Sequence, residues 1–342
     1  MIDAAPTSPR ALVCVTGLGV ALPRTRLPSA ALDQRLGKPV GWTERHSGVA
    51  LRHVAEPDEP QEALATAAAT AALADAGVRA DQLDLIMFAA AVGRQPIPAT
   101  APLIKHLLGV RDVPFPAFDI NATCLSALTA LDVAGLYLSA GRARRVLVVS
   151  AEIASRALPW PTDPATAALF GDGAGALVLE ARDDAAAPRR LLHVHMETYA
   201  QGYELCQLAS GGTRFDYHND EKGFAAHARF QMDGAGLYRL SAREAPGFID
   251  RLLAGAGWTH EDVDLVVPHQ ASPHALAHII RRCGFSADKV IDIVRSHGNQ
   301  IAASLPIALV HARDTGRLQP GMKVMLVGTA AGVSLGGACL VV

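Results

Sequence analysis

Three residues of types suited to acyl transfer stand at breaks between apolar segments. Cys124 lies in "FDINATCLSAL", His269 in "VVPHQAS" and Asn299 in "RSHGNQIAASLPIAL". A cysteine can carry an acyl group as a thioester, and histidine and asparagine can donate hydrogen bonds where negative charge develops. Each residue also has a common structural explanation, as a small core residue, a structural histidine or a helix cap. Together, the three suit acyl transfer through a thioester.

The segments around Cys124 predict a turn between a strand and a helix. The preceding "FPAFDI" suits a buried strand, and the leucines of the following "LSALTALDVAGLYLSAG" recur at near-helical spacing before Gly141. The amino end of a helix favours a thiolate, so we expect a lowered pKa for Cys124.

His269 and Asn299 stand in comparable places. His269 leaves a buried strand at the position where the first half of the chain has Ala89, and Asn299 lies in a turn before a helix. Because such turns converge at one end of the sheets in an α/β protein, we expect the three residues to meet there.

A faint internal repeat predicts the elements that position these residues. "ADAGVRADQLDLIMFA" begins at Ala74 and "AGAGWTHEDVDLVVPH" at Ala254, a separation of 254 − 74 = 180 positions. Each copy is typical of a helix end, a glycine stop, an acidic turn and a buried strand. We therefore expect two halves, residues 1–185 with the cysteine and residues 186–342 with the histidine and asparagine. Each should form a helix-covered sheet, with helices shared between the halves.

Composition excludes several classes of protein. Half of the 342 residues are hydrophobic, 19% are charged and the formal net charge is −2. These values exclude a disordered chain and give no sign of a nucleic-acid-binding surface. The five cysteines are far apart and form no CxxC pair, which argues against a disulfide framework or zinc site and favours a reducing, cytoplasmic location. The apolar stretch 11–22 is too short for a membrane span.

The chain resembles the thiolase-superfamily condensing enzymes, and among them β-ketoacyl-ACP synthase III. The resemblance spans nearly the whole chain and rests on "WTERHSGVALRHV", "DINATC", "FGDGAGALVL", "VVPHQAS", "HGNQIAAS" and the final glycine-rich segment. It implies a duplicated five-layered αβαβα thiolase fold, usually a homodimer, that needs no metal or redox cofactor. It also implies that "FGDGAG", which has no Walker lysine, is a buried turn and not a phosphate loop.

The resemblance further implies roles for particular residues. Cys124 would be the acylated nucleophile, and His269 and Asn299 would bind the thioester carbonyl of the extender and stabilise its enolate. The remaining implied roles are an oxyanion hole formed by the backbone N–H groups of Cys124 and Gly332, stacking of Trp42 on the adenine of coenzyme A, and docking of acyl carrier protein on Arg239, Arg281 and Arg282.

Several positions depart from the family pattern and favour a specialised member with another acyl chain or acceptor. They are His46 for an arginine, Ser272 for a pantetheine-contacting asparagine, His274 for a docking arginine, Ala330 for an aromatic beside the malonyl site, Ile97 for the aromatic that closes the acyl pocket from the partner subunit, and Leu125 for a small residue.

The favoured hypothesis is a decarboxylative Claisen condensation. An acyl group from coenzyme A or a carrier protein would load onto Cys124, and a malonyl-type extender would lose CO2 and attack it, in specialised fatty acid or polyketide biosynthesis. The expected partners are acyl-CoA, acyl carrier protein and a second copy of the chain, with no nucleic acid and no membrane.

Other hypotheses stay open. Acyl transfer to an alcohol or amine would use His269 as a base, and two acyl-CoAs could condense without decarboxylation. A degradative thiolase is less favoured, because Cys339 lies in an apolar strand and not at a catalytic turn. An inactive partner subunit would typically lose the nucleophile, and a Cys-His hydrolase would need water at the thioester.

Overall fold

The computed structural model describes residues 11–184 and 188–342. Its strands form one continuous ladder in the order β11-β12-β13-β8-β1-β7-β6-β4-β5. β1 and β8 pair only at Cys14 and Arg190, so the ladder consists of two sheets that join at one edge. The strands are β1 Leu12–Ala21, β4 Leu85–Ala89, β5 Ala117–Ile120, β6 Arg145–Glu152, β7 Gly173–Arg182, β8 Arg190–Thr198, β11 Leu265–Pro268, β12 Lys323–Ala330 and β13 Ser334–Val341.

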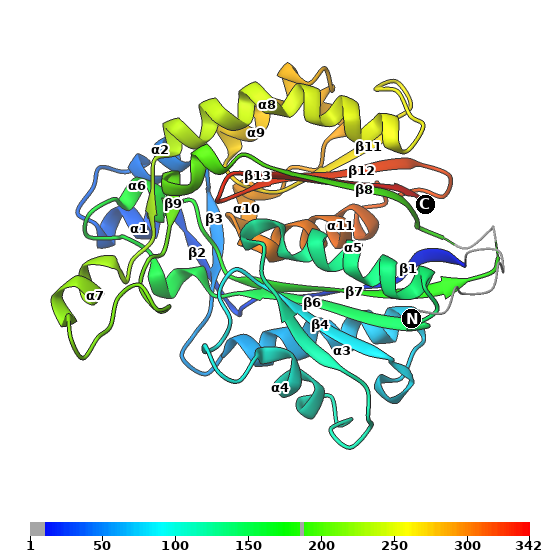
Figure 1. The fold of residues 1–342 in the computed structure, drawn as a ribbon. Helices are drawn as coiled ribbons and strands as arrows, with labels where there is room; N and C mark the ends of the chain where they lie inside the picture. The colour runs from blue at the N-terminus through cyan, green and yellow to red at the C-terminus, as the bar shows by residue number, and fades with distance from the viewer. Residues whose placement is uncertain (1–10, 185–187) are drawn as a thin grey trace.

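Helices cover both sheets and fill the space between them. The first sheet consists of β1, β7, β6, β4 and β5, and the second of β11, β12, β13 and β8. In Figure 1, α3 and α4 lie below the first sheet, α5 and α11 lie between the sheets, and α8 and α9 lie above the second sheet. This is the five-layered αβαβα arrangement expected from the sequence. The layer helices are α3 Gln61–Ala76, α4 Thr100–Leu107, α5 Ser126–Ser139, α8 Gly234–Gly255, α9 Pro273–Arg282 and α11 Ser304–Asp314.

Strand directions repeat between the sheets. β4 is parallel to β6, which is followed by antiparallel β7 and β1, and β11 is parallel to β12, which is followed by antiparallel β13 and β8. Beside β11, Val290 forms an isolated parallel bridge with Val266 in the place that β5 takes beside β4. The expected boundary between residues 185 and 186 lies outside the described residues.

Close packing of α3 on the first sheet depends on glycines of β1. A Cβ atom at Gly17 would lie 2.2 Å from the carbonyl oxygen of Ala72, and one at Gly19 would lie 2.2 Å from that of Ala68. Because backbone cannot give way at this distance, the alanine-rich face of α3 requires both glycines. The helix then covers the outer face of the sheet and leaves the opposite face for α5.

The remaining elements lie around the edge of the sheets where the carboxyl ends of β4 and β11 are found. The expected excursion at 201–228 contains a short strand and a helix, and Tyr203 there is strongly exposed. None of the helices in residues 11–184 and 188–342 has the length and apolar character needed to cross a bilayer. These elements are β2 Thr25–Pro28, α1 Ser29–Arg35, α2 Trp42–Ser47, β3 Leu51–Val54, α6 Pro164–Ala167, β9 Cys206–Gln207, α7 Glu221–His227, β10 Gln231–Met232 and α10 Val294–His297.

Candidate active site

Cys124, His269 and Asn299 line one cavity of about 1290 Å³. Cys124 lies between β5 and α5, His269 directly follows β11, and Asn299 lies between α10 and α11. The structure therefore brings together three residues that are 145 and 30 positions apart in the chain, as the sequence predicted.

A hydrogen-bonded turn holds Cys124. Asn121 Oδ1 accepts the N–H of Thr123 at 2.9 Å, while Asn121 Nδ2 donates to the carbonyl of Ala91, two residues after β4, also at 2.9 Å. Ser126 Oγ accepts the N–H of Ala122 at 2.9 Å and donates to the carbonyl of Thr123 at 2.6 Å. These bonds fix Cys124 at the amino end of α5, between the two sheets.

The expected lowering of the pKa of Cys124 is wrong for this structure. Burial raises the pKa of its thiol far above the usual value, and Cys206 and Glu152 raise it further. Hydrogen bonds from the backbone N–H groups of Ala331 and Cys124 lower it, but by less than burial raises it. The thiol is therefore protonated at neutral pH, and its attack on a thioester requires a proton acceptor.

The second N–H group at the sulfur belongs to Ala331. The resemblance implied the N–H of Gly332 as an oxyanion-hole donor, and the turn between β12 and β13 brings the N–H of the preceding residue to the Cys124 sulfur. Gly332 has a φ of +126°, a backbone conformation that favours glycine. Gly332 therefore shapes the turn that brings the N–H of Ala331 to Cys124.

His269 is held by Ser304. Its Nδ1 atom lies 2.6 Å from Ser304 Oγ, which also donates to the carbonyl of Ile301 at 2.9 Å. Burial lowers the pKa of His269 to about 4, so the imidazole is neutral at pH 7. With Nδ1 engaged, Nε2 is the ring nitrogen left for a substrate or for the thiol.

The side-chain amide of Asn299 has a defined orientation. Its Oδ1 accepts the N–H of Ile301 at 2.8 Å, and its Nδ2 donates to the carbonyl of Ala271 at 3.3 Å. Because the oxygen is already used, the group that Asn299 can offer to the cavity is the second N–H of Nδ2. A hydrogen-bond donor is what stabilisation of an enolate oxygen requires.

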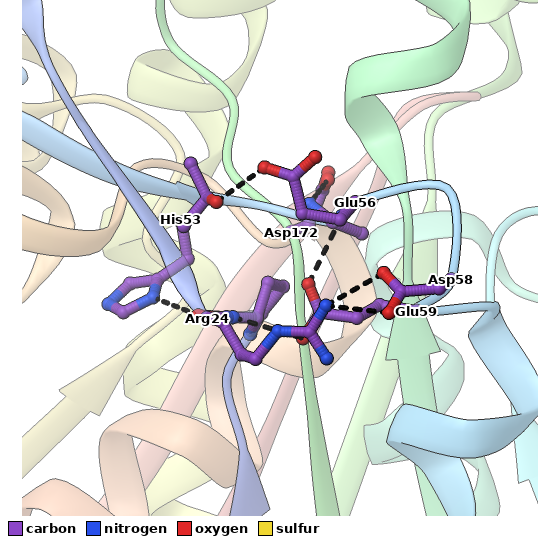
Figure 2. Close-up of polar contacts among 9 residues, drawn as sticks. Arg24, His53, Glu56, Asp58, Glu59 and Asp172 are labelled. Carbon is purple, nitrogen blue, oxygen red and sulfur yellow. Dashed lines mark hydrogen bonds and ion pairs between the residues drawn. The ribbon is translucent and has the colours of Figure 1, made fainter.

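The "FGDG" turn forms a hydrogen bond with the backbone of Asn299. The N–H of Gly171 donates to the carbonyl of Asn299 at 3.1 Å, and Asp172 is fully buried. The Asp172 carboxylate accepts the N–H of Ala55 at 2.8 Å, while its own N–H donates to the carbonyl of His53 at 2.9 Å. Figure 2 shows Asp172 beside His53 and Glu56. Residues 170–173 are all buried, which agrees with the buried turn that the resemblance implied.

Figure 2 also shows the hydrogen bonds that hold the loop after β3, which contacts Asp172. Arg24 Nη2 donates to both carboxylate oxygens of Asp58, at 2.7 and 2.8 Å, and the N–H of Arg24 donates to Glu59 at 3.0 Å (Figure 2). Glu59 in turn accepts the N–H of Glu56 at 3.1 Å. This network anchors the loop after β3 and so stabilises the support of Asn299.

Leu125 fits beside the nucleophile because two strand positions facing it are glycines. A Cβ atom at Gly328 would lie 3.0 Å from Leu125 Cδ2 and 2.8 Å from the Cβ atom of His269. A Cβ atom at Gly336 would lie 3.0 Å from Leu125 Cδ1. Leu125, which departs from the family pattern, therefore depends on the glycines at 328 and 336 for the space beside His269.

Glu152 is a site residue that the sequence did not single out. It ends β6, is 1% exposed, lines the cavity, and accepts the N–H of Ala91 at 2.6 Å. Burial raises its pKa to about 8, so the carboxyl is largely protonated at pH 7. Its signal in the sequence is an acidic residue that directly ends the apolar run "RVLVVSA".

Of the residues assigned to coenzyme A and extender binding, Ser272 and Ala330 line the cavity, and Trp42 contacts His46, which also lines it. The rings of Trp42 and His46 stack with centroids 4.2 Å apart, and His46 is exposed. Ser272 lines the cavity, but its Oγ also accepts the N–H of Ala275 at 3.2 Å in the first turn of α9. Ala330 is buried in the wall.

The other assigned residues lie outside the cavity. Ile97 is 86% exposed and does not line it. The three arginines assigned to carrier docking, Arg239, Arg281 and Arg282, are exposed on α8 and α9. The structure thus places these residues where a second protein could reach them.

Comparisons with known proteins identify relatives across the chain. Residues 118–200 match the family described as 3-oxoacyl-[acyl-carrier-protein (ACP)] synthase III, and residues 253–342 match its C-terminal family. A β-ketoacyl-[acyl-carrier-protein] synthase III from Rhodospirillum rubrum is 37% identical over 95% of this chain and 97% of its own.

Comparison with solved structures also identifies condensing enzymes. The 3-oxoacyl-(acyl carrier protein) synthase III of Pseudomonas aeruginosa is 32% identical, covers 96% of this chain and 98% of its own, and has a TM-score of 0.86. The priming β-ketosynthase of a polyketide biosynthetic pathway is 26% identical, covers 99% of both chains and has a TM-score of 0.88.

Proposed function

The chain belongs to the 3-oxoacyl-[acyl-carrier-protein] synthase III family of condensing enzymes, and on this basis we propose that Cys124, His269 and Asn299 perform its decarboxylative Claisen condensation. As an acyltransferase of this type, the protein forms an acyl-Cys124 thioester and converts it with a malonyl-type thioester into a 3-oxoacyl product.

Loading begins with attack of Cys124 Sγ on the carbonyl of an acyl thioester. The new oxyanion receives hydrogen bonds from the amides of Cys124 and Ala331, in place of the expected pair of Cys124 and Gly332. Neutral His269 accepts the thiol proton at Nε2 when its Nδ1–H donates to Ser304. The departing thiol of the carrier takes that proton.

Condensation uses the same histidine as a hydrogen-bond donor. Loss of CO2 from the extender leaves an electron pair that is delocalised onto the thioester oxygen, where Nε2–H of His269 and Nδ2–H of Asn299 stabilise it. The enolate carbon then attacks the acyl carbon, and Cys124 leaves as a thiolate. A Ser304 hydroxyl that donates to Nδ1 holds the proton of His269 on Nε2, which is the tautomer this step needs.

The surroundings support a thioester donor presented by coenzyme A or acyl carrier protein. Trp42 with His46 offers an aromatic surface beside the cavity for the adenine ring, and Ser272 and Ala330 line the path of the arm. The exposed Arg239, Arg281 and Arg282 would dock an acidic carrier protein.

We further propose that the protein acts as a cytoplasmic homodimer. Ile97 is a large apolar side chain with 86% exposure, which a partner subunit would cover, and it would then close the acyl pocket of that subunit. Isoleucine leaves more room than an aromatic ring, so acyl chains longer than acetyl fit this pocket.

The orientation of Asn299 is the observation that carries the proposal. Simple acyl transfer to an alcohol or amine needs a nucleophile, a base and an oxyanion hole, and it leaves the donor of Asn299 without a role. Condensation uses that donor on the enolate.

Intact-mass analysis after incubation with a panel of acyl-CoAs tests the first half-reaction. The wild-type protein should gain one acyl group, and Cys124→Ala should gain none. An adduct that persists in Cys124→Ala, or that maps to Cys14, Cys206, Cys283 or Cys339, contradicts the assignment.

A further inference from the structure

The turns that carry Cys124 and Asn299 each contain a strained backbone residue. Thr123, directly before the nucleophile, has a φ of +52°. Ile301, two residues after Asn299, has a φ of +50°. Both side chains branch at Cβ, and branched residues seldom adopt a positive φ because the Cβ atom then crowds the backbone. Such a conformation persists only where surrounding contacts hold it, so each turn depends on contacts from other segments.

Glu152 points from the end of β6 into the space between the two sheets. On this strand, Val149 and Ala151 pack in the hydrophobic cluster that contains residues of α3. Val148 packs instead in the cluster that contains residues of α5 and α11, the two helices that Figure 1 shows between the sheets. Side chains alternate along a strand, so Glu152 lies on the face of Val148, towards both catalytic turns.

The carboxyl of Glu152 accepts backbone N–H groups from two separate segments. The N–H of Ala91 donates to it at 2.6 Å, and that of Val92 also donates to it, both from the loop after β4. A third N–H comes from Ala302, in the short turn Ile301–Ala303. One buried side chain therefore connects two segments that lie on opposite sides of the reaction centre in the sequence.

The first of these segments holds the turn of Cys124. The carbonyl of Ala91 accepts Nδ2 of Asn121 at 2.9 Å, and Oδ1 of Asn121 accepts the N–H of the strained Thr123 at 2.9 Å. A chain of hydrogen bonds thus runs from Glu152 through the loop after β4 to the residue before the nucleophile.

Gln61 fixes the same loop from a second side. Its Nε2 atom donates to the carbonyls of Val92 and Ala151, each at 2.8 Å, and the side chain is buried. The backbone N–H and carbonyl groups of Ala91 and Val92 are then all paired. Buried backbone groups rarely stay unpaired, so the loop has one preferred position, and this position requires the carboxyl of Glu152.

The second segment holds the turn of Asn299. Ala302 directly follows the strained Ile301, whose own N–H donates to Oδ1 of Asn299 at 2.8 Å. The bond from Ala302 to Glu152 fixes the peptide after Ile301, and with it the N–H that orients the amide of Asn299.

We propose that Glu152 is a positioning residue that connects the two catalytic turns, holding the loop after β4 and the turn Ile301–Ala303 so that Cys124 and Asn299 keep the relative placement that condensation requires. This inference rests on the proposed function of those two residues. Glu152 acts through backbone groups and exchanges no proton with the substrate.

Glu152→Ala tests this role, because it removes the acceptor of all three N–H groups. The rate of acyl loading on Cys124 and kcat for CO2 release from malonyl-CoA should each fall about 10²-fold, the cost of roughly 1 Å of misplacement of a catalytic group. KM for malonyl-CoA should change little, because Glu152 makes no contribution to uniform binding of the substrate.

Glu152→Gln should recover most of the lost rate. Because burial raises the pKa of Glu152 to about 8, the carboxyl is largely neutral at pH 7, and glutamine preserves this charge together with an accepting carbonyl oxygen. Glu152→Asp keeps the acid but is one methylene shorter and cannot reach both segments, so it should remain slow. It also replaces Glu152→Ala as the test if the alanine variant does not fold.

Glu180→Ala is the matched control. Glu180 is 4% exposed on the adjacent strand β7, accepts Arg145 Nε at 2.7 Å and does not line the cavity. Its loss also removes a buried carboxyl, but it should slow neither half-reaction. Equal slowing in Glu180→Ala and Glu152→Ala would mean that general destabilisation explains the effect, and would overturn the inference.

Amide hydrogen exchange gives a readout that does not depend on turnover. Peptides that cover residues 119–126 and 299–305 should exchange at least about tenfold faster in Glu152→Ala than in the wild type, the effect of losing one buried hydrogen bond. Wild-type rates and exchange in Glu152→Ala, equal losses in Glu152→Gln and Glu152→Ala, or a change confined to KM would each overturn the inference. A wild-type protein that neither loads nor decarboxylates would overturn the proposed function instead, and the exchange rates would still decide the role of Glu152.

Discussion

Nδ1 of His269 lies 2.6 Å from Oγ of Ser304, and this contact couples the position of the imidazole proton to the direction in which the Ser304 hydroxyl donates. The Ser304 hydroxyl has two potential acceptors, Nδ1 and the carbonyl of Ile301, and can donate to only one of them at a time. Donation to Ile301 leaves Nε2 as a base for the thiol, and donation to Nδ1 makes Nε2–H a donor to the enolate. Ser304 therefore acts as a positioning residue for both half-reactions.

Ser304→Ala should lower the rate of decarboxylation of a malonyl thioester by about 10²-fold. This is the cost of displacing a catalytic group, here the His269 imidazole, by roughly 1 Å. KM should change little, because Ser304 is buried behind His269 and does not line the cavity. The measurement is labelled CO2 release as a function of pH. Ser296→Ala is the control, since Ser296 Oγ lies 2.8 Å from Nδ1 of His297 in an exposed pair. Equal loss of activity in both variants would refute the role of Ser304.

Glu152→Gln should make the free energy of unfolding less dependent on pH. The folded-state pKa of Glu152 is raised to about 8 from 4.5, so its stabilising contribution is complete below pH 4.5 and is lost as pH rises towards 8. The loss can reach about 1.4 kcal/mol per pH unit. Glutamine resembles the protonated carboxyl and should remove that slope.

Urea unfolding at pH 5 and pH 8 measures this difference for the wild type, Glu152→Gln and the exposed control Glu44→Gln. A glutamine variant that loses as much stability over this interval as the wild type would show that Glu152 is ionised in the folded protein.

Gly328→Ala should destabilise the protein by about 1–3 kcal/mol and displace His269. The new methyl group would lie 2.8 Å from the Cβ atom of His269 and 3.0 Å from Leu125 Cδ2, so the core there would be overpacked. Gly212→Ala is the control, because a Cβ atom there meets nothing within 4 Å. Gly328→Ala should lower both the free energy of unfolding and the rate of CO2 release, whereas Gly212→Ala should change neither. Unchanged activity in Gly328→Ala would contradict the tight packing described around His269.

Ile97→Phe should shift loading of Cys124 towards short acyl chains. The aromatic ring would fill the pocket of the partner subunit, so octanoyl-CoA should lose more than acetyl-CoA in competitive loading followed by intact mass. Val40→Phe is the control, since Val40 has the same 86% exposure and does not line the cavity. An unchanged preference would mean that Ile97 does not reach a partner's pocket.

The fold was predictable from local patterns. The repeat at 180 positions and the leucine spacing after Cys124 predicted the two sheets and the strand, turn and helix around the nucleophile, and each is confirmed. These features depend on hydrophobic periodicity and glycine stops, which are written in short windows of sequence.

Electrostatics of the site were less predictable. The position of Cys124 before a helix suggested a lowered pKa, but burial by distant segments outweighs the helix end. Glu152 acquires its protonated state from enclosure at the meeting of loops from β4 and α11, which no window around residue 152 contains. The identity of the second amide, Ala331, depends on turn geometry at the level of one residue.

Asn299→Ala is the variant that tests the central claim most directly, because it separates loading from condensation. Loading uses the amides of Cys124 and Ala331, which Asn299 does not contact, whereas enolate formation loses one of its two donors at a cost of about 10²–10³ in rate.

The measurement follows adduct mass and labelled CO2 release in parallel. The account predicts that Asn299→Ala still gains the acyl group on Cys124 but neither releases CO2 from a malonyl thioester nor forms product. Blocked loading with normal CO2 release in that variant would contradict the division of roles. A wild-type protein that never decarboxylates malonyl thioesters, yet passes its acyl group to an alcohol or amine, would replace condensation with acyl transfer.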